Sequence, residues 1–240
     1  MRRFVGTICI LALPFLAPAC GRDAADQEYF AALQGEETGM GREAQLAHVE
    51  RAIALQPRRA WYRETHAIYS IDTKRFAAAT ADLDTAIALA DRPYLRFLRG
   101  MVACERGNYD SSLADFDLAI TGQPENNQFY RGRSLARSAL GRYREALEDA
   151  GRLVRLVPQQ AESHYALGMA LQGMGRLGEA LRAFDEALVR RPELIYPLRA
   201  RADVYERLGD MKRAADDRAE AARREAEHSG YAVSLDPFRY

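Results

Sequence analysis

The 240-residue sequence predicts an all-α protein, a solenoid of about six helical hairpins. Three observations support this fold class. A pattern recurs about every 34 residues from Asp26 to His228. Each copy contains two segments with apolar residues at helical spacing. Glycine between those segments and proline after the second one mark the turns. A repeat of this length is typical of arrays in which each unit buries its apolar face by stacking on its neighbours.

The unit at 161–194 shows how one copy produces a hairpin. Gly175 lies between its two segments, where a residue without Cβ can end a helix in the left-handed conformation. Pro192 stops the second helix. Small residues at unit positions 8, 20 and 27 let the two helices approach closely. The apolar faces of the first and second helices are formed by Leu167, Gly168 and Leu171, and by Ala180, Phe184, Ala187 and Leu188.

The units vary along the chain, and their limits are expected near 26–59, 60–92, 93–126, 127–160, 161–194 and 195–228. The first unit lacks the turn pattern, and Gly35 weakens its first helix. The second unit is one residue short before Pro93. In the last unit Arg218 replaces the aromatic residue, and the second helix is strongly charged. A terminal capping helix needs such a surface, because no neighbour covers its outer face.

These residues resemble the tetratricopeptide repeat (TPR), over about 200 residues and most specifically from 93 to 209. The resemblance implies helical hairpins stacked into a right-handed superhelix with a concave inner surface. In that family, unit positions 2, 5, 9 and 12 of each first helix line the concave face. The resemblance therefore implies a peptide-binding groove lined by Tyr94, Phe97, Met101, Arg131, Leu135, Tyr165, Met169 and Arg199. The alternative is that some of these side chains contact the neighbouring hairpin and belong to the core.

The first 19 residues have the features of an export signal. A basic start is followed by an uncharged apolar run from Phe4 to Leu16, which is too short to span a bilayer. Small residues precede Cys20, so cleavage is expected just before it. The segment resembles a bacterial lipobox, with Ala17 where that family usually has Leu. The resemblance implies lipidation of Cys20; plain secretion and an uncleaved anchor are the alternatives.

If Cys20 is acylated, the protein is held close to a membrane. Residues 20–25 would form the tether, and five residues after the cysteine reach at most about 17 Å. Gly21 follows the cysteine where retained inner-membrane lipoproteins usually carry Asp, so the resemblance implies an outer-membrane lipoprotein facing the periplasm. The tail at 229–240 is apolar and is expected either to fold back onto the solenoid or to dock on another chain.

Unit positions 7 and 23 change together within this one sequence. Where position 7 is Arg, position 23 is Asp, and where position 7 is Leu167, position 23 is Ala183. In the second unit His66 stands with Asp82. Because the two positions face each other across a hairpin, we expect bidentate ion pairs between its helices. The alternative is that these arginines bind an anionic ligand. The expected pairs are Arg99 with Asp115, Arg133 with Asp149, and Arg201 with Asp217.

The sequence offers little support for catalysis or for a cofactor. His48, His66, His164 and His228 lack metal-ligand spacing, so no metal site is expected. Cys104 is expected to be a packing residue rather than a nucleophile. No glycine-rich phosphate loop or nucleophile elbow is present. The 34 basic and 34 acidic residues balance, which argues against nucleic-acid binding.

The sequence therefore predicts a protein that works by binding. The leading hypothesis is a non-enzymatic TPR adaptor of the bacterial cell envelope, which holds a segment of a partner envelope protein in its groove. Two alternatives stay open: a secreted, non-lipidated regulatory or chaperone-like protein, and an accessory subunit of an envelope enzyme complex. A homo-oligomer formed through the terminal units is compatible with the sequence but is not indicated by it.

Overall fold

The computed structural model describes residues 23–228, and these residues form helices joined by short turns. The all-α prediction is confirmed for this part of the chain. The helices belong to two compact units, which are considered separately below: unit 1 comprises the described residues up to Ala90, and unit 2 begins at Asp91. The predicted signal peptide, Cys20 and the apolar tail at 229–240 lie outside the described residues.

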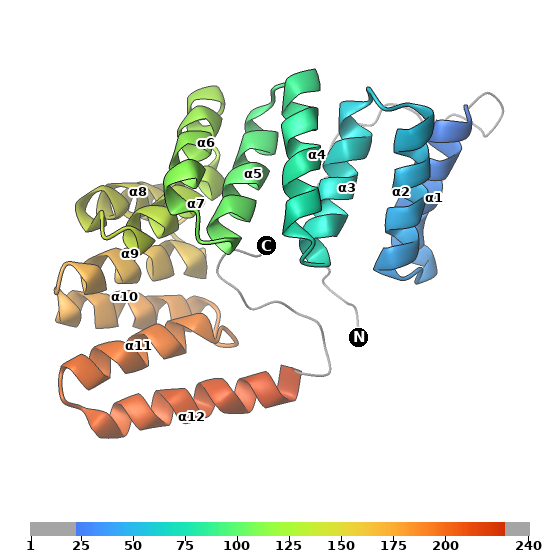
Figure 1. Cartoon of the computed structure of the whole chain (residues 1–240). Helices are drawn as coiled ribbons and strands as arrows, with labels where there is room; N and C mark the ends of the chain where they lie inside the picture. The colour runs from blue at the N-terminus through green and yellow to red at the C-terminus, as the bar shows by residue number, and fades with distance from the viewer. Residues whose placement is uncertain (1–22, 229–240) are drawn as a thin grey trace. The chain divides into compact units, whose positions relative to one another are not determined.

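Unit 1 contains two hairpins around a core that is rich in tyrosine and alanine (Figure 1). The first helix starts at Ala24 because the Asp23 side chain accepts a hydrogen bond from the backbone N–H of Asp26, at 2.9 Å. The ring of Tyr62 is completely buried, with its centroid 4.8 Å from that of Tyr29. The helices are α1 (Ala24–Thr38), α2 (Arg42–Leu55), α3 (Ala60–Asp72) and α4 (Phe76–Leu89).

Unit 2 contains four hairpins that follow one another along a curved path (Figure 1). Each helix packs against the next one in the chain, and each hairpin packs against its neighbour. Burial of these apolar faces is the main stabilising contribution. The helices are α5 (Pro93–Glu105), α6 (Tyr109–Gly122), α7 (Asn127–Ala139), α8 (Tyr143–Leu156), α9 (Ala161–Gly173), α10 (Leu177–Arg190), α11 (Tyr196–Arg207) and α12 (Met211–His228).

The turns inside the hairpins have the left-handed geometry predicted for Gly175, whose φ is +77°. In each such turn of unit 2 the glycine has a positive φ, and the next N–H bonds to a carbonyl five residues back, as in a Schellman motif. In unit 1 the first hairpin turns in the same way at Gly39, with φ of +75°, so the expectation that the first unit lacks this turn is wrong. In the second hairpin of unit 1 the position is occupied by Lys74, with φ of +59°. A side chain with Cβ is strained there, because Cβ crowds the backbone in this region.

Close helix approach in unit 2 depends on small residues opposite aromatic rings. A Cβ added at Gly168 would lie 2.4 Å from the ring of Phe184, and one added at Gly100 would lie 2.8 Å from the ring of Phe116. Both rings are completely buried. The small residue and the aromatic ring therefore fill the space between the two helices of a hairpin together, as the repeat pattern predicts.

The predicted ion pairs are present and bidentate. Arg133 donates from Nε and Nη2 to the two carboxylate oxygens of Asp149, at 2.9 and 2.7 Å. Arg99 binds Asp115 in the same way, with both distances 2.7 Å. Arg201 binds Asp217 at 2.8 and 2.7 Å. The aspartates are buried, so each pair joins the two helices of one hairpin beneath the surface.

A third partner, which the sequence analysis did not predict, extends these pairs to the preceding hairpin. The remaining Nη1 of Arg133 donates to Asp117 on α6, at 2.6 Å. The Nη1 of Arg201 donates to Asp185 on α10, also at 2.6 Å. In both cases the acid is at unit position 25 of the hairpin before. These arginines therefore connect successive hairpins as well as the helices within one hairpin.

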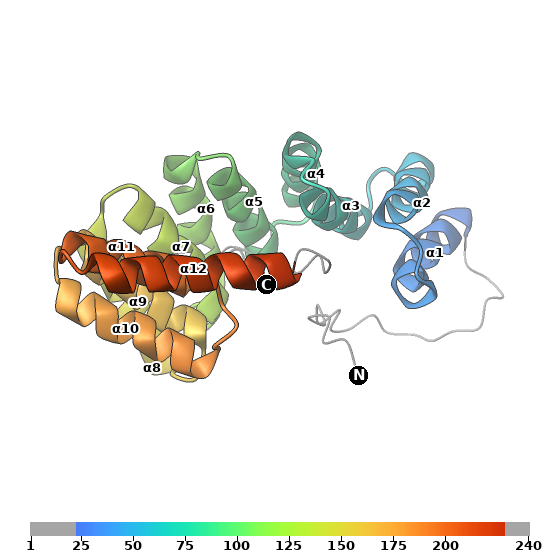
Figure 2. The ribbon, with the colours of Figure 1, turned by 90° about the horizontal axis from the view of Figure 1, so that it is seen from below.

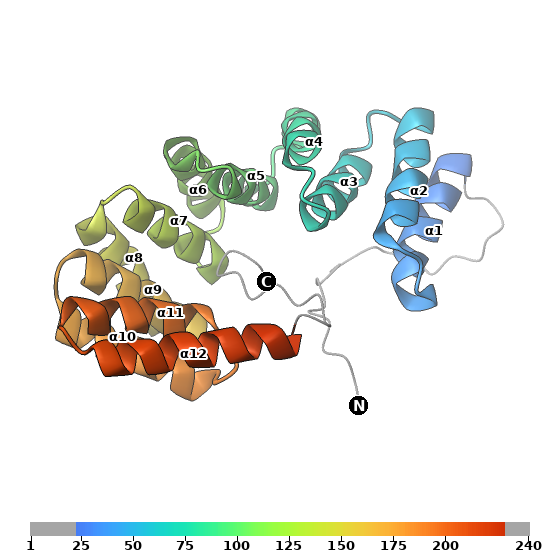
Figure 3. The ribbon, with the colours of Figure 1, turned by 60° about the horizontal axis from the view of Figure 1, so that its bottom comes forward.

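The last helix of unit 2 differs from the others. With 18 residues, α12 is longer than the 12-residue α11, and its last turns project beyond the start of α11 (Figures 1 and 3). Seen from below, it is the helix nearest the viewer (Figure 2). Arg223, Arg224 and Glu220 form ion pairs along its surface. Within residues 23–228, no helix is both long and apolar enough to span a bilayer.

Candidate functional site

The candidate binding surface of unit 2 is the face formed by the first helices of its hairpins, here called the inner face. Successive first helices contact one another: α5 contacts α7, α7 contacts α9, and α9 contacts α11. Each second helix, α6, α8 or α10, contacts the first helix of its own hairpin and the first helix of the next hairpin. Residues from several hairpins can therefore contact one bound segment along this face.

Four of the predicted groove residues contribute mainly to the core. Phe97 has no exposed surface, and its ring centroid lies 5.1 Å from that of Phe129 and 5.9 Å from that of Phe116. The expectation that Phe97 lines a groove is therefore corrected, since the ring fills the space between α5, α6 and α7. Met101, Leu135 and Tyr165 are also buried, with exposed fractions of 6%, 6% and 8%. They offer a ligand an edge at most.

The other four predicted groove residues keep accessible surface. Tyr94, Arg131 and Met169 are half-buried, and Arg199 is exposed. Met169 packs against the core cluster that includes Leu135 and Tyr165, so its exposed part continues an apolar wall. The Nη2 atom of Arg199 forms an ion pair with Glu225 on α12, at 2.5 Å. A ligand at Arg199 would have to compete with this pair, whereas Met169 is available without such competition.

A compact group of aromatic and charged residues lies where α7, α9 and α11 meet. We call it the Tyr196 cluster, and it consists of Arg131, Glu162, Tyr165, Arg191 and Tyr196. The rings of Tyr165 and Tyr196 meet edge to face, with centroids 4.5 Å apart. Arg191 forms an ion pair with Glu162, at 2.7 Å. The two rings are 8% and 9% exposed, so the cluster presents the edges of two tyrosine rings with charges of both signs around them.

The electrostatics of the cluster keep Tyr196 in its neutral form. Burial raises the pKa of the Tyr196 hydroxyl, and the negative charge of Glu162 raises it further. Arg131 and Arg191 oppose this effect but do not cancel it. At neutral pH the hydroxyl therefore remains protonated and can donate a hydrogen bond. Together with the Arg131 guanidinium, it gives this surface donor groups suited to backbone carbonyls or a carboxylate.

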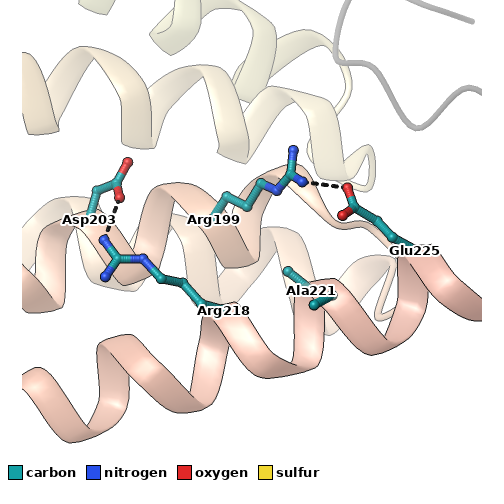
Figure 4. A pocket seen from close by; sticks show the side chains of 6 residues that line it. Arg199, Asp203, Arg218, Ala221 and Glu225 are labelled. Carbon is teal, nitrogen blue, oxygen red and sulfur yellow. Dashed lines mark hydrogen bonds and ion pairs between the residues drawn. The ribbon is translucent and has the colours of Figure 1, made fainter.

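A concave site lies at the end of unit 2, between α11 and α12 (Figure 4). Its volume is about 380 Å³, and Ala221 and Ala222 form part of its lining. Ion pairs cross it: Arg199 binds Glu225, and Arg218 binds Asp203 at 3.2 Å. Arg218 also contacts Glu206. The charged side chains of this cleft pair with one another. Such a polar surface is expected at the terminal hairpin of a repeat array, because no further hairpin covers it.

Cys104 and His164, which were considered as a nucleophile and as a metal ligand, are buried packing residues. Burial raises the pKa of the Cys104 thiol to about 11, so it is protonated at neutral pH and is a poor nucleophile. His164 is buried, and its Nε2 donates to the Pro158 carbonyl oxygen at 2.9 Å. No group of three or more potential ligands among the described residues could hold a metal ion.

The sequence analysis missed two members of the Tyr196 cluster. Glu162 occupies unit position 2, the same position as Tyr94 and Tyr196, but an acid there has the pattern of an ordinary solvated helix residue. Arg191 lies near the end of its unit, directly after α10, and its pair with Glu162 brings it to the cluster. Inspection of position 2 in every unit could have found Glu162, whereas the role of Arg191 required the folded structure.

Comparison with protein families identifies the repeat directly. A tetratricopeptide repeat family model matches residues 65–127, 131–195 and 165–230, which together include more than half of the chain. The chain belongs to the tetratricopeptide repeat family. As a member, it carries the repeat of a family whose proteins typically act as scaffolds for protein–protein interaction.

Its curated relatives share only a segment with it. The chain is 33% identical to the Hsp70-Hsp90 organizing protein of Triticum aestivum over 94 residues, which cover 39% of this chain and 16% of that protein. It is 38% identical to the TPR repeat-containing thioredoxin TTL4 of Arabidopsis thaliana over 84 residues, covering 35% of this chain and 12% of the relative. The chain therefore spans a small part of these proteins.

Solved structures resemble the chain over most of its length. A tetratricopeptide repeat protein from Parabacteroides merdae matches with a TM-score of 0.72 and 15% identity, covering 83% of this chain and 79% of that one. PilW, a type IV pilus biogenesis factor, matches with a TM-score of 0.70 and 19% identity, covering 89% and 97%. YrrB, described as having an unusual peptide-binding site, matches with a TM-score of 0.54 and 20% identity, covering 75% and 94%. These similarities confirm the predicted solenoid class.

Proposed function

We propose that this TPR protein is a non-enzymatic adaptor of the bacterial cell envelope, which binds a partly apolar segment of a partner protein on the inner face of unit 2. The bound segment, extended or helical, would lie across α7, α9 and α11. Its apolar side chains would contact Met169 and the edges of Tyr165 and Tyr196, and its carbonyl or carboxylate groups would face Arg131.

The observation that carries this proposal is the composition of the accessible part of the inner face. Met169 and Arg131 keep surface next to an aromatic pair, on successive helices that contact one another. Methionine adapts its shape to different apolar partners, and arginine gives directional hydrogen bonds. The fold of YrrB, a TPR protein with a peptide-binding site, agrees with this use.

The binding face can be tested with a matched pair of positions in one hairpin. A photo-crosslinking amino acid replaces Met169 on α9 or Val189 on α10, which is 75% exposed and lies on the second helix. We expect a discrete crosslinked partner from position 169 and none from position 189, as identified by mass spectrometry from intact cells.

A pair of charge substitutions provides the control for specificity. Met169→Glu should lower recovery of that partner at least about ten-fold, because it places a carboxylate in an apolar contact. Val189→Glu should leave recovery unchanged, and circular dichroism should show that both variants are folded. Recovery of the same proteins from both crosslinking positions, or an unaffected Met169→Glu variant, contradicts binding on this face.

The proposed envelope location depends on the N-terminal segment and on lipidation of Cys20. Cells grown with an alkyne-labelled fatty acid should incorporate the label into this protein, and the protein should sediment with membranes. Cys20→Ser should abolish both. A mature protein that lacks the label and remains in the soluble periplasmic fraction supports the secreted alternative, while leaving the binding face of unit 2 to its own test.

A further inference from the structure

The arginine that joins successive hairpins in unit 2 has a titratable counterpart in unit 1. At the same unit position as Arg133 and Arg201, α3 carries His66. Its Nδ1 atom lies 2.5 Å from Oδ2 of Asp82 on α4, and its Nε2 atom lies 3.4 Å from Oε1 of Glu50 on α2. His66 therefore contacts the acid of its own hairpin and the position-25 acid of the preceding hairpin.

Arginine and histidine differ in the pH range over which they can donate hydrogen bonds to both acids, the one in their own hairpin and the one in the preceding hairpin. A guanidinium remains charged throughout the accessible pH range and always has several N–H donors. An imidazole has two N–H donors only when protonated, and it has one when neutral. A neutral His66 can therefore donate to Asp82 or to Glu50 but not to both.

We propose that His66 is a pH-operated clamp between the two hairpins of unit 1. When protonated, it donates to Asp82 and to Glu50 and holds α2 against the α3–α4 hairpin. When it loses its proton, one carboxylate loses its donor and the joint between the hairpins weakens. The corresponding joints at Arg133 and Arg201 in unit 2 do not respond to pH in this range.

The surroundings of His66 determine the direction of the effect. Burial lowers its pKa, but the hydrogen bonds and charges of Asp82 and then Glu50 outweigh burial, so the pKa is raised above its ordinary value. Arg63 on α3 also faces this group, because its Nη1 atom donates to Asp82 at 2.9 Å. The His66 side chain is 12% exposed and that of Asp82 is 10% exposed, so water screens the contact within the hairpin only weakly. The Glu50 side chain is 58% exposed, so water and salt screen the contact with the preceding hairpin more strongly.

The sign of the pH dependence follows from the raised pKa. Below the ordinary histidine pKa of about 6.5, the imidazole is charged in folded and unfolded chains alike, and the full stabilisation is present. As pH rises from there through the folded pKa, the folded protein loses the proton and the stabilisation disappears. Each unit of difference between the two pKa values changes the unfolding equilibrium constant by up to about ten-fold.

Unit 1 contains a convenient reporter for this effect. Trp61 is the only tryptophan in the sequence, lies on α3 and is 39% exposed. Urea denaturation of the full chain, followed by Trp61 fluorescence between pH 5.5 and 8.5, therefore reports on the helix that carries His66. We expect the urea midpoint to fall as pH rises through and above about 6.5 in the wild-type protein.

Two substitutions separate His66 from other titrating groups. His66→Arg should remove this fall, because it installs the side chain found at this position in unit 2. His48→Gln should preserve it, since His48 contacts Glu28 and Arg51 of a separate cluster between α1 and α2. An unchanged pH slope in His66→Arg, or a slope lost in His48→Gln, overturns the proposal.

An NMR titration provides a measurement that needs no variant to fold. The imidazole signals of His66 in the wild-type full chain should titrate with a pKa above about 6.5. A midpoint at or below that value overturns the proposal, whatever the denaturation curves show.

Discussion

Units 1 and 2 build the same kind of hairpin from different chemical groups. In unit 2, the hairpin turns use glycine in the left-handed conformation, and Arg133 and Arg201 connect successive hairpins. In the second hairpin of unit 1, the equivalent positions hold Lys74, which is strained, and His66, whose charge depends on pH, whereas the first hairpin turns at Gly39 with a φ of +75°. The repeat pattern therefore specifies where the chain turns and where successive hairpins form an ionic contact. The residue at each position decides how stable the turn is and whether the contact depends on pH.

The largest effect is expected from removing a buried acid in unit 2. Asp149→Ala leaves Arg133 and Arg137 facing a site without its carboxylate, since both bind Asp149. We expect a loss of about 3–5 kcal/mol in the free energy of unfolding, because a desolvated charge loses its partner. Urea denaturation followed by circular dichroism measures this loss.

The comparison with unit 1 makes this prediction sharper. Asp82→Ala should cost less, about 1.5–3 kcal/mol, because His66 can lose its proton, so that only Arg63 is left charged without this carboxylate, whereas Asp149→Ala affects two arginines. The double substitution Arg133→Leu with Asp149→Ala should also be milder than Asp149→Ala alone, since the chain itself uses Leu167 with Ala183. Equal losses for Asp149→Ala and Asp82→Ala would remove the proposed difference between the two units.

A smaller effect is expected where a glycine faces an aromatic ring. Gly168→Ala places a methyl group against Phe184, so we expect a net loss of about 1–2 kcal/mol after the gain in helix propensity. Gly178→Ala is the matched control, because no atom lies within 4 Å of the added Cβ, and it should be neutral or stabilising. In unit 1 the equivalent of Gly168 is already Ala67, opposite Leu83 rather than a phenylalanine.

The smallest effect is expected at the strained turn of unit 1. Lys74→Gly removes the crowding at a φ of +59° and should stabilise the turn by roughly 1 kcal/mol. The gain should appear as a higher urea midpoint of Trp61 fluorescence. Gly175→Lys is the reverse substitution in unit 2, and urea denaturation followed by circular dichroism should show a lower midpoint for it. A higher midpoint for Gly175→Lys would contradict the assignment of strain.

Much of the fold could be predicted from the sequence because the repeat supplies internal comparisons. The left-handed turn at Gly175 follows from its place between two apolar segments. The pairing of Arg133 with Asp149 follows because Leu167 and Ala183 replace both members together in another unit. In each case the chain contains several versions of the same contact. When two unit positions change together from one repeat to another, the residues at those positions can be inferred to contact each other.

The rest depended on packing between hairpins, which the repeat does not describe. The contact of Arg133 with Asp117 crosses from one unit to the preceding one, and nothing within a single unit indicates it. Phe97 occupies the same unit position as Tyr165 and Arg199, yet its ring is completely buried and Arg199 is exposed. The accessible part of the inner face therefore depends on how much of each side chain the next hairpin covers.

The charge bridges between hairpins also restrict the order in which hairpins can be joined. Asp185 accepts a hydrogen bond from Arg201 of the next hairpin. Gly151 holds the position equivalent to Asp185 one hairpin earlier, and there the next hairpin carries Leu167, which needs no acidic partner. Deleting residues 161–194 would set Gly151 beside Arg201 and leave that cation without its second carboxylate. The hairpins are thus not interchangeable. A shortened, duplicated or reordered array must keep each bridging arginine next to a hairpin that carries its acidic partner, in addition to keeping the repeat length.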